Sequence, residues 1–145
     1  MRISKIREVK TPTRGTSYSA GIDFFVPEDV KPFILSPGDS CFIPSGIKVR
    51  VPEGYALVAF NKSGVAVKKS LHVGAAVVDE DYQGEVHINL TNVGNYEQEI
   101  NPGDKIVQFV LIPMMYAGVE VVPENKLFDR ETERGQGGFG STGTR

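Results

Sequence analysis

Glycine residues recur through the middle of this chain at intervals of eight to ten residues. The series runs through Gly38, Gly46, Gly54, Gly64, Gly74, Gly84, Gly94 and Gly103. A proline stands one or two residues before four of these glycines, as in Pro37-Gly38 and Pro102-Gly103. Proline presets φ for a turn, and glycine accepts the positive φ that many turns require. Turn signals at this spacing predict many short strands, arranged in a sandwich or a barrel.

The segments between these turns carry strand patterns. Apolar and polar residues alternate over 47–51 and over 86–91, so each segment is expected to bury one face. The runs 55–60 and 106–112 are almost continuously apolar, which is consistent with strands buried on both faces. The only helical signal predicts one or two turns from Ser63, which could act as the N-cap.

The composition excludes several classes of protein. The chain has 145 residues, enough for one ordinary domain, and no stretch approaches the roughly 18–20 apolar residues of a membrane span. The charged N-terminus lacks the apolar region of a secretory signal. A single cysteine, Cys41, excludes an intrachain disulfide and a Cys-x-x-Cys zinc pair. We expect Cys41 to be a small buried residue and the compartment to be the cytoplasm.

Several catalytic patterns are absent from the sequence. There is no Walker phosphate loop, no Gly-x-Ser-x-Gly elbow and no zinc deaminase signature. His72 and His87 are too few for a metal site made by histidines, and we expect both on strand surfaces. The net charge of −2 argues against tight, sequence-independent binding of nucleic acid.

The segment 73–85 joins an apolar run to an acidic turn at 79–81 and then to an alternating strand. This order predicts a β-hairpin with the acids at its bend. The acids could form an ordinary solvated turn. Asp79, however, directly follows Val77 and Val78. A carboxylate at the end of an apolar strand could be partly desolvated, and it could orient or deprotonate a water.

Two further segments could bind anions. The segment 61–64, Asn-Lys-Ser-Gly, combines a cation, a hydroxyl and a permissive backbone at a helix start, which would suit phosphate oxygens. The segment 134–145 holds five glycines and one aromatic residue, a composition typical of a disordered tail. It also fits a flap in which Arg134 meets an anion and Phe139 stacks on a ring. A weaker alternative is an RGG-type tail that binds nucleic acid.

Five short segments, taken in order, resemble the five motifs of the trimeric dUTPase family. They are Ser19-Ala-Gly-Ile-Asp-Phe24, Asn61-Lys-Ser-Gly-Val-Ala66, Gly74-Ala-Ala-Val-Val-Asp-Glu-Asp-Tyr-Gln-Gly84, Gly103-Asp-Lys-Ile-Val-Gln108 and Arg134-Gly-Gln-Gly-Gly-Phe-Gly-Ser-Thr-Gly143. Each segment alone is weakly specific. Five in order, over nearly the whole chain and at family-like spacing, are strongly specific.

The resemblance implies a fold and a reaction. The fold would be all-β, a single-domain jelly-roll-type β-barrel over 1–133, followed by a flexible Gly-rich flap over 134–145. The chain would form a homotrimer with its sites at subunit interfaces. The reaction would be the Mg²⁺-dependent hydrolysis of dUTP to dUMP and pyrophosphate, through attack of water on the α-phosphate. It would keep uracil out of DNA and supply dUMP for thymidylate synthesis.

The resemblance also implies roles for single residues around the base and the sugar. Asp79 would hold and activate the attacking water. Tyr82 would pack on the deoxyribose and leave no room for a 2′-hydroxyl. The uracil edge would be bound along the hairpin, at Val73, Val77, Val78 and His87.

The phosphates would be bound by residues of the other motifs. Their oxygens would be contacted by Lys62, Ser63, Gly64 and Gln108. The fifth motif would close over them through Arg134, Gly140, Ser141 and Thr142, with Phe139 over the uracil. Asp23 would be a supporting acid. Mg²⁺ would be held mainly by substrate phosphates and water rather than directly by the protein.

Two positions depart from the family pattern. The second motif usually begins Pro-Arg-Ser, and Lys62 keeps the positive charge but loses the planar bidentate fork of arginine. Phosphate orientation, and hence the rate, would depend on this change. The third motif often has glycine where Ala76 stands, and a methyl group there would tighten or shift the uracil pocket.

Three other functions are compatible with parts of the sequence. A dCTP deaminase or a dual-function enzyme would share the fold, but Asp79 with Tyr82 and the full Gly-rich tail favours the hydrolase. A non-catalytic nucleotide-binding or regulatory protein would also share the fold, and Lys62 in place of arginine would then reflect a loss of activity. An RGG-type nucleic-acid binder is disfavoured by the negative net charge.

Overall fold

The computed structural model describes residues 1–138 and divides the chain into a compact unit, Met1–Met115, and a second unit from Tyr116 onward. Within the described residues, all the strands and the α-helix belong to the first unit, and the second contains a single 3₁₀ helix, Glu124–Lys126. The compact unit therefore ends well before the domain boundary predicted at 133/134. A separate role for 134–145 stays a prediction.

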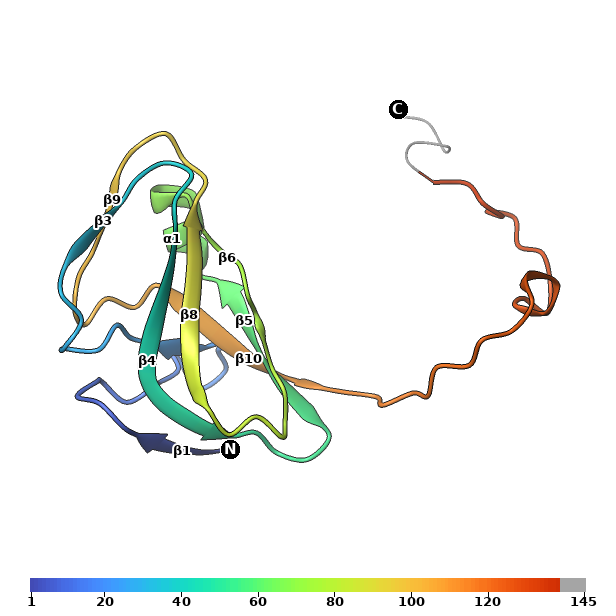
Figure 1. Ribbon diagram of the computed structural model, residues 1–145, viewed down its shortest axis with the longest axis horizontal. Coiled ribbons are helices and arrows are strands. Elements are labelled where there is room, and N and C mark those ends of the chain that lie inside the picture. The colour runs from blue at the N-terminus through green and yellow to red at the C-terminus, as the bar shows by residue number, and fades with distance from the viewer. Residues whose placement is uncertain (139–145) are drawn as a thin grey trace. The chain divides into compact units, whose positions relative to one another are not determined.

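The first sheet of the compact unit has the strand order β1-β4-β8-β6, and all neighbours are antiparallel (Figure 1). Its strands are β1 (Arg2–Lys5), β4 (Ser40–Arg50), β8 (Glu85–Asn92) and β6 (Leu71–Val73). Along β8, half-buried and buried residues alternate at every position. This confirms the one-sided strand that the alternation over 86–91 predicts.

The second sheet has the order β2-β10-β5-β7. Its strands are β2 (Ile22–Phe24), β10 (Val107–Pro113), β5 (Tyr55–Asn61) and β7 (Val77–Val78). The two apolar runs predicted as strands form β5 and β10, which are adjacent and antiparallel. Burial on both faces is wrong for β5, because Phe60 remains 44% exposed. An antiparallel sheet commonly packs only one face on the core.

The core lies between the two sheets. Phe24 of β2 and Phe109 of β10 are fully buried there, with ring centroids 4.5 Å apart. A small third sheet pairs β3 (Phe33–Leu35) with β9 (Gln98–Ile100). The predicted all-β, jelly-roll-type class is confirmed. Within residues 1–138, however, the sheets stay open and do not close into a barrel.

The regularly spaced glycines fall into two groups. Positive φ values of 73° to 85° occur at the four that follow a proline, Gly38, Gly46, Gly54 and Gly103. These positions confirm the predicted turns, because positive φ is disfavoured for residues with a side chain. The other four glycines do not adopt positive φ. Gly74 and Gly84 instead lie against neighbouring side chains.

The predicted short helix is present as α1, Ser63–Lys69. The assignment of Ser63 as its N-cap is wrong, because Ser63 is the first helical residue and Lys62 occupies the N-cap without a side-chain capping bond. Lysine has no acceptor atom with which to cap a helix. None of the helices in the described part of the chain is long and apolar enough to cross a membrane.

Candidate active site

The segment predicted as a single hairpin divides between the two sheets. Val73 ends β6, which pairs with β8, whereas β7 leaves this sheet and pairs with β5. The acids at 79–81 do lie in the turn between β7 and β8, as predicted. The simple hairpin is wrong, because β5 of the opposite sheet, and not β8, supplies the hydrogen-bonding partner of β7.

The crossing between the sheets is fixed by Asn89 of β8. Its Oδ1 accepts a hydrogen bond from the amide of Ala75 at 2.8 Å, and its carbonyl accepts one from the amide of Gly74 at 3.1 Å. A methyl group at Gly74 would come within 2.1 Å of Asn89 Oδ1. A side chain at this position would displace the Asn89 amide from its bond to Ala75, which favours glycine where the chain leaves the first sheet.

The divergence of β7 from β8 leaves a mainly apolar cavity of about 160 Å³. Five of the residues predicted to bind substrate or water line it: Val77, Val78, Asp79, Tyr82 and His87. Ala76, one of the two departures from the family pattern, lines it as well. The structure thus brings together the residues predicted to contact the base, the sugar and the water, except Val73, which does not line the cavity, and Phe139, which lies outside the described residues.

Asp79 is exposed in the chain by itself. Its carbonyl accepts a hydrogen bond from the amide of Tyr82 at 3.2 Å, which closes the turn. The partial desolvation expected of its carboxylate is therefore not found within this chain. A side chain at the rim of a cavity becomes desolvated only when ligand or another subunit covers it.

The two histidines differ in their surroundings. His72 is exposed on β6, as predicted. His87 is half-buried, and its ring stacks on Phe42 of β4 with a centroid separation of 4.3 Å and an interplanar angle of 2°. Phe42 also lines the cavity, yet sequence reasoning missed it. Nothing in the pattern of β4 distinguishes it, and only the pairing of β4 with β8 brings the two rings together.

A second group of predicted residues gathers around Asp23, which is 4% exposed. Its carboxylate forms an ion pair with the ammonium group of Lys62 and a second one, at 3.2 Å, with Nζ of Lys105. Gln108 lies opposite Asp23 in the pairing of β10 with β2, and its Nε2 donates to the carbonyl of Asn61 at 2.8 Å. The first, second and fourth motif segments therefore meet at one place.

Lys105 is a residue of this second group that sequence reasoning missed. Its signal is the segment 103–108, in which it is the only cation. Ser63 and Gly64 begin α1 directly after Lys62. Two cations, a hydroxyl and a helix start are thus adjacent, a combination that suits phosphate oxygens.

The two groups remain apart in one chain. Neither Asp23 nor Lys62 nor Gln108 lines the cavity. Arg134 belongs to the second unit, where its Nε donates to the carbonyl of Gly137 at 2.9 Å. Four of the predicted residues lie outside the described part of the chain: Phe139, Gly140, Ser141 and Thr142.

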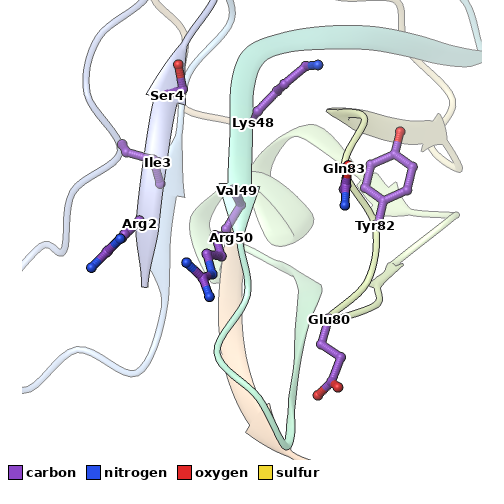
Figure 2. Close-up of a pocket in the computed structure, with 9 residues that line it drawn as sticks. All are labelled: Arg2, Ile3, Ser4, Lys48, Val49, Arg50, Glu80, Tyr82 and Gln83. Carbon is purple, nitrogen blue, oxygen red and sulfur yellow. The ribbon is translucent and has the colours of Figure 1, made fainter.

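A larger pocket, of about 560 Å³, lies between β1, the end of β4 and the acidic turn (Figure 2). Three basic side chains line it, Arg2, Lys48 and Arg50, but Tyr82 is the only predicted site residue among its walls. The smaller cavity is therefore the better candidate for the base, because it combines apolar walls with the predicted residues.

The acidic turn offers carboxylates that could contribute to binding Mg²⁺, and one of them, Asp79, lies beside the cavity. Over residues 1–138 there is no cluster of three or more His, Cys, Asp or Glu side chains that could hold a metal ion. The carboxylates of 79–81 are oxygen donors of the kind that Mg²⁺ prefers. They fit an ion that keeps most of its ligands from water and a phosphorylated substrate.

The fold and the cavity define a class: an all-β, jelly-roll-like protein with a small apolar cavity beside a carboxylate. Comparison with known proteins identifies the family within this class. The family model of dUTPase matches residues 7–143, and the chain belongs to the dUTPase family. This membership confirms the family and the enzyme class expected from the sequence, a dUTP diphosphatase.

Individual relatives extend over nearly the whole chain. The deoxyuridine 5′-triphosphate nucleotidohydrolase of Mus musculus is 41% identical, over 99% of this chain and 85% of that protein. The enzyme of the same name from Hydrogenobaculum sp. (strain Y04AAS1) is 36% identical, over 97% of this chain and 96% of that protein.

Solved structures show the same fold. A mutant dUTPase of Staphylococcus bacteriophage 80alpha with dUpNHpp has a TM-score of 0.85 at 25% identity, and the match covers 98% of this chain and 97% of that chain. A mutant dUTPase from phage phi11 of S. aureus, described with a structural Mg(II) ion, has a TM-score of 0.75 at 25% identity. That match covers 85% of this chain and 96% of the phage chain.

Proposed function

We propose that this chain hydrolyses dUTP to dUMP and pyrophosphate, with the base in the cavity between β7 and β8 and with Asp79 as the general base. The observation that carries the proposal is the cavity itself. Its apolar walls end at a tyrosine, a histidine and a carboxylate, which are groups suited to a sugar, a base edge and a water.

The base would enter between β7 and β8. The cavity is small and mainly apolar, so it suits a single planar ring. The backbone of Val77 and Val78, which form the two-residue strand β7, would supply amide and carbonyl groups for the uracil edge. His87 borders the same space.

The sugar would lie against Tyr82. The hydroxyl of Tyr82 donates to the carbonyl of Glu85 at 2.9 Å, so the ring is held across the turn. A ring fixed in this way packs on a deoxyribose and leaves no room for a 2′-hydroxyl. This contact would discriminate dUTP from UTP.

Asp79 would accept a hydrogen bond from a water and take its proton as the water attacks the α-phosphorus. A bond forms between the water oxygen and the α-phosphorus, and the bond from this phosphorus to the bridging oxygen of the β-phosphate breaks. Pyrophosphate leaves, and the proton stays on Asp79 until it passes to solvent. Mg²⁺, held mainly by phosphate oxygens and water, would neutralise charge on the triphosphate.

The phosphates would be bound by the group around Asp23, through Lys62, Ser63, Gly64 and Gln108. Because this group does not line the cavity of its own chain, we propose that the active site forms between copies of a homotrimer. The cavity of one copy would lie beside the phosphate-binding residues around Asp23 of another copy. Arg134 and the rest of the fifth motif would act as a flap that closes over the bound triphosphate.

The decisive experiment is a product profile across dUTP, dCTP, dTTP and UTP in the presence of Mg²⁺. We expect dUMP and pyrophosphate from dUTP, and much slower turnover of the other three. In Asp79→Asn the rate should fall by at least about a hundredfold, the lower range of general acid–base catalysis. Undiminished turnover in that variant would refute the role of Asp79, and ammonia release from dCTP would refute the reaction.

The assembly has its own test. Sedimentation should give about three times the mass of the 15.8 kDa chain. The mass of a single chain in a sample that hydrolyses dUTP would refute a site formed between copies.

A further inference from the structure

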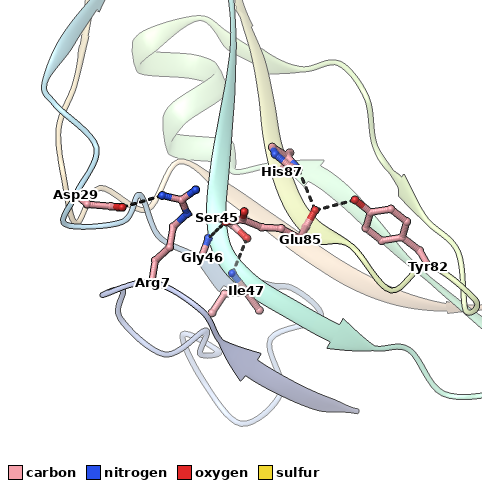
Figure 3. Close-up of polar contacts among 8 residues, drawn as sticks. All are labelled: Arg7, Asp29, Ser45, Gly46, Ile47, Tyr82, Glu85 and His87. Carbon is pink, nitrogen blue, oxygen red and sulfur yellow. Dashed lines mark hydrogen bonds and ion pairs between the residues drawn. The ribbon is translucent and has the colours of Figure 1, made fainter.

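Two residues that border the cavity share one hydrogen-bond acceptor. The carbonyl oxygen of Glu85 accepts a hydrogen bond from the hydroxyl of Tyr82 at 2.9 Å and another from Nδ1 of His87, also at 2.9 Å (Figure 3). Tyr82 stands in the turn before β8, and His87 stands within the strand. The first residue of β8 thus connects both.

We propose that Glu85 is a positioning residue that sets how Tyr82 and His87 face the ligand, and so sets selectivity for both sugar and base. The inference rests on the proposed function, because it assigns the sugar to Tyr82 and the base edge to His87. Glu85 also lines the cavity, but the proposed role does not require it to touch the substrate. It acts through the two side chains that its carbonyl holds.

The side chain of Glu85 is fixed to a bulge in β4. Pro44 lies opposite His87 and Lys48 lies opposite Glu85, so positions 45–47 of β4 face the single residue 86 of β8. A bulge of this kind leaves backbone groups outside the regular ladder. The carboxylate of Glu85 fills this gap, because its Oε1 accepts a hydrogen bond from the amide of Gly46 at 2.7 Å.

The same carboxylate oxygen binds the N-terminal segment. Nε of Arg7 lies 3.0 Å from Oε1 of Glu85, and Nη1 of Arg7 lies 2.7 Å from Oδ2 of Asp29. The Arg7 guanidinium is a permanent cation, and hydrogen bonds to Asp29 and to Glu85 raise its pKa further. The Glu85 side chain is only 16% exposed, so these bonds are partly shielded from water. The side chain anchors the position of its own carbonyl.

The bond to Glu85 also fixes the tautomer of His87. A carbonyl oxygen only accepts, so Nδ1 must carry the hydrogen. In the neutral ring Nε2 is then an acceptor, and the stack on Phe42 holds the plane of the ring. Uracil carries a donor at N3, whereas cytosine carries an acceptor there. A ring that offers Nε2 as an acceptor favours uracil.

The test compares Glu85→Ala and Glu85→Gln with a matched control, Glu99→Ala. The alanine variant removes both bonds of the carboxylate, whereas glutamine keeps an acceptor for Gly46 and loses the charge opposite Arg7. Glu99 is an exposed carboxylate of β9 that forms none of these bonds. Thermal melting of all three variants checks that each is folded.

We expect Glu85→Ala to raise KM for dUTP and to lower the preference for dUTP over both UTP and dCTP by about tenfold, the factor that corresponds to 1.4 kcal/mol. The kcat of this variant for dUTP, which depends on Asp79, should be mostly retained. Glu85→Gln should restore part of the preference, and Glu99→Ala should match the unmodified protein. Unchanged preferences in a folded Glu85→Ala variant would overturn the proposal.

A ligand-free measurement separates this proposal from the proposed function. In a His72→Gln background, long-range ¹H–¹⁵N NMR at about pH 8.5, where histidine side chains are ordinarily neutral, reports the tautomer of His87. We expect hydrogen on Nδ1, and a mixture of tautomers once Glu85→Ala is added. Hydrogen on Nε2 would overturn the proposal. The expected tautomers in a protein that leaves dUTP intact would support the positioning role and refute the proposed reaction.

Discussion

The ring of Tyr82 lies directly against Gly84. A methyl group at Gly84 would come within 2.3 Å of the Tyr82 hydroxyl oxygen and within 2.4 Å of Cζ. The glycine is thus needed for a close approach and not for a positive φ. It allows the tyrosine to fold back over the turn and reach the carbonyl of Glu85.

Replacing Gly84 by alanine should displace the Tyr82 ring. The new methyl group cannot be accommodated without a shift, so the bond to Glu85 should break and the sugar contact should loosen. We expect KM for dUTP to rise, and the preference for dUTP over UTP to fall by about tenfold, as for a loss of 1.4 kcal/mol. Steady-state kinetics with both nucleotides measures this. Gly15→Ala is the control, since the nearest atom to a methyl group there is 3.6 Å away, and equal behaviour of the two variants would contradict the prediction.

Lys62→Arg should retain or increase turnover. The ammonium group of Lys62 now pairs with the carboxylate of Asp23, and a guanidinium can pair with a carboxylate or a phosphate through two parallel bonds. Lys62→Met, which keeps the length but removes the charge, should lower kcat/KM for dUTP by roughly tenfold or more, as for the loss of a hydrogen bond to a charged group. A collapse of activity in Lys62→Arg would show that the pocket is built around lysine.

Much of the framework could be predicted from the sequence because it depends on local pattern. Alternation identified β8, and a proline followed by glycine identified the turns with positive φ. The serine and glycine after Lys62 marked the start of α1, although the N-cap was misassigned. Each of these features is decided within a few residues of chain.

The cavity could be predicted only in part, because it depends on which strands pair. The acidic turn was identified from the order of residues along the chain, and Tyr82 from the resemblance of the segment 74–84 to the third family motif. The pairing of β7 with β5, however, joins positions about twenty residues apart in the other sheet, and no local pattern specifies it. Phe42 and Glu85 acquire their roles only through the register of β4 with β8. Sequence reasoning therefore missed both.

Asp23→Asn should destabilise the fold and disturb the arrangement of the residues around Asp23 that are proposed to bind the phosphates. The buried carboxylate holds Lys62 and Lys105, and its loss leaves two cations without this partner. We expect the free energy of unfolding to fall by about 1–3 kcal/mol, the cost of leaving a partly buried polar group without its partner. Urea titration measures the change. Asp39→Asn, at an exposed position, should change it little, and the prediction fails if the two variants are equally stable.

The reactivity of Cys41 should depend on pH in a direction set by its burial. Cys41 is half-buried in β4 and forms no disulfide. Desolvation raises the pKa of its thiol above the ordinary value of 9.0. Since the thiolate is the nucleophile, alkylation by iodoacetamide at pH 8 should be slower in the folded protein than in urea, and the difference should persist as the pH rises towards 9.

The same shift predicts how stability changes with pH. As the pH rises through 9.0, the thiol of the unfolded chain loses its proton first, while the folded chain keeps it. The folded state then binds more protons than the unfolded state, so stability falls with increasing pH in this range. Below this range both states are protonated, and the contribution of the thiol is fully present. Replacing Cys41 by alanine should remove this part of the pH dependence, which urea titrations at pH 7.5 and pH 10 can measure. An identical slope in Cys41→Ala would assign the loss of stability to other groups.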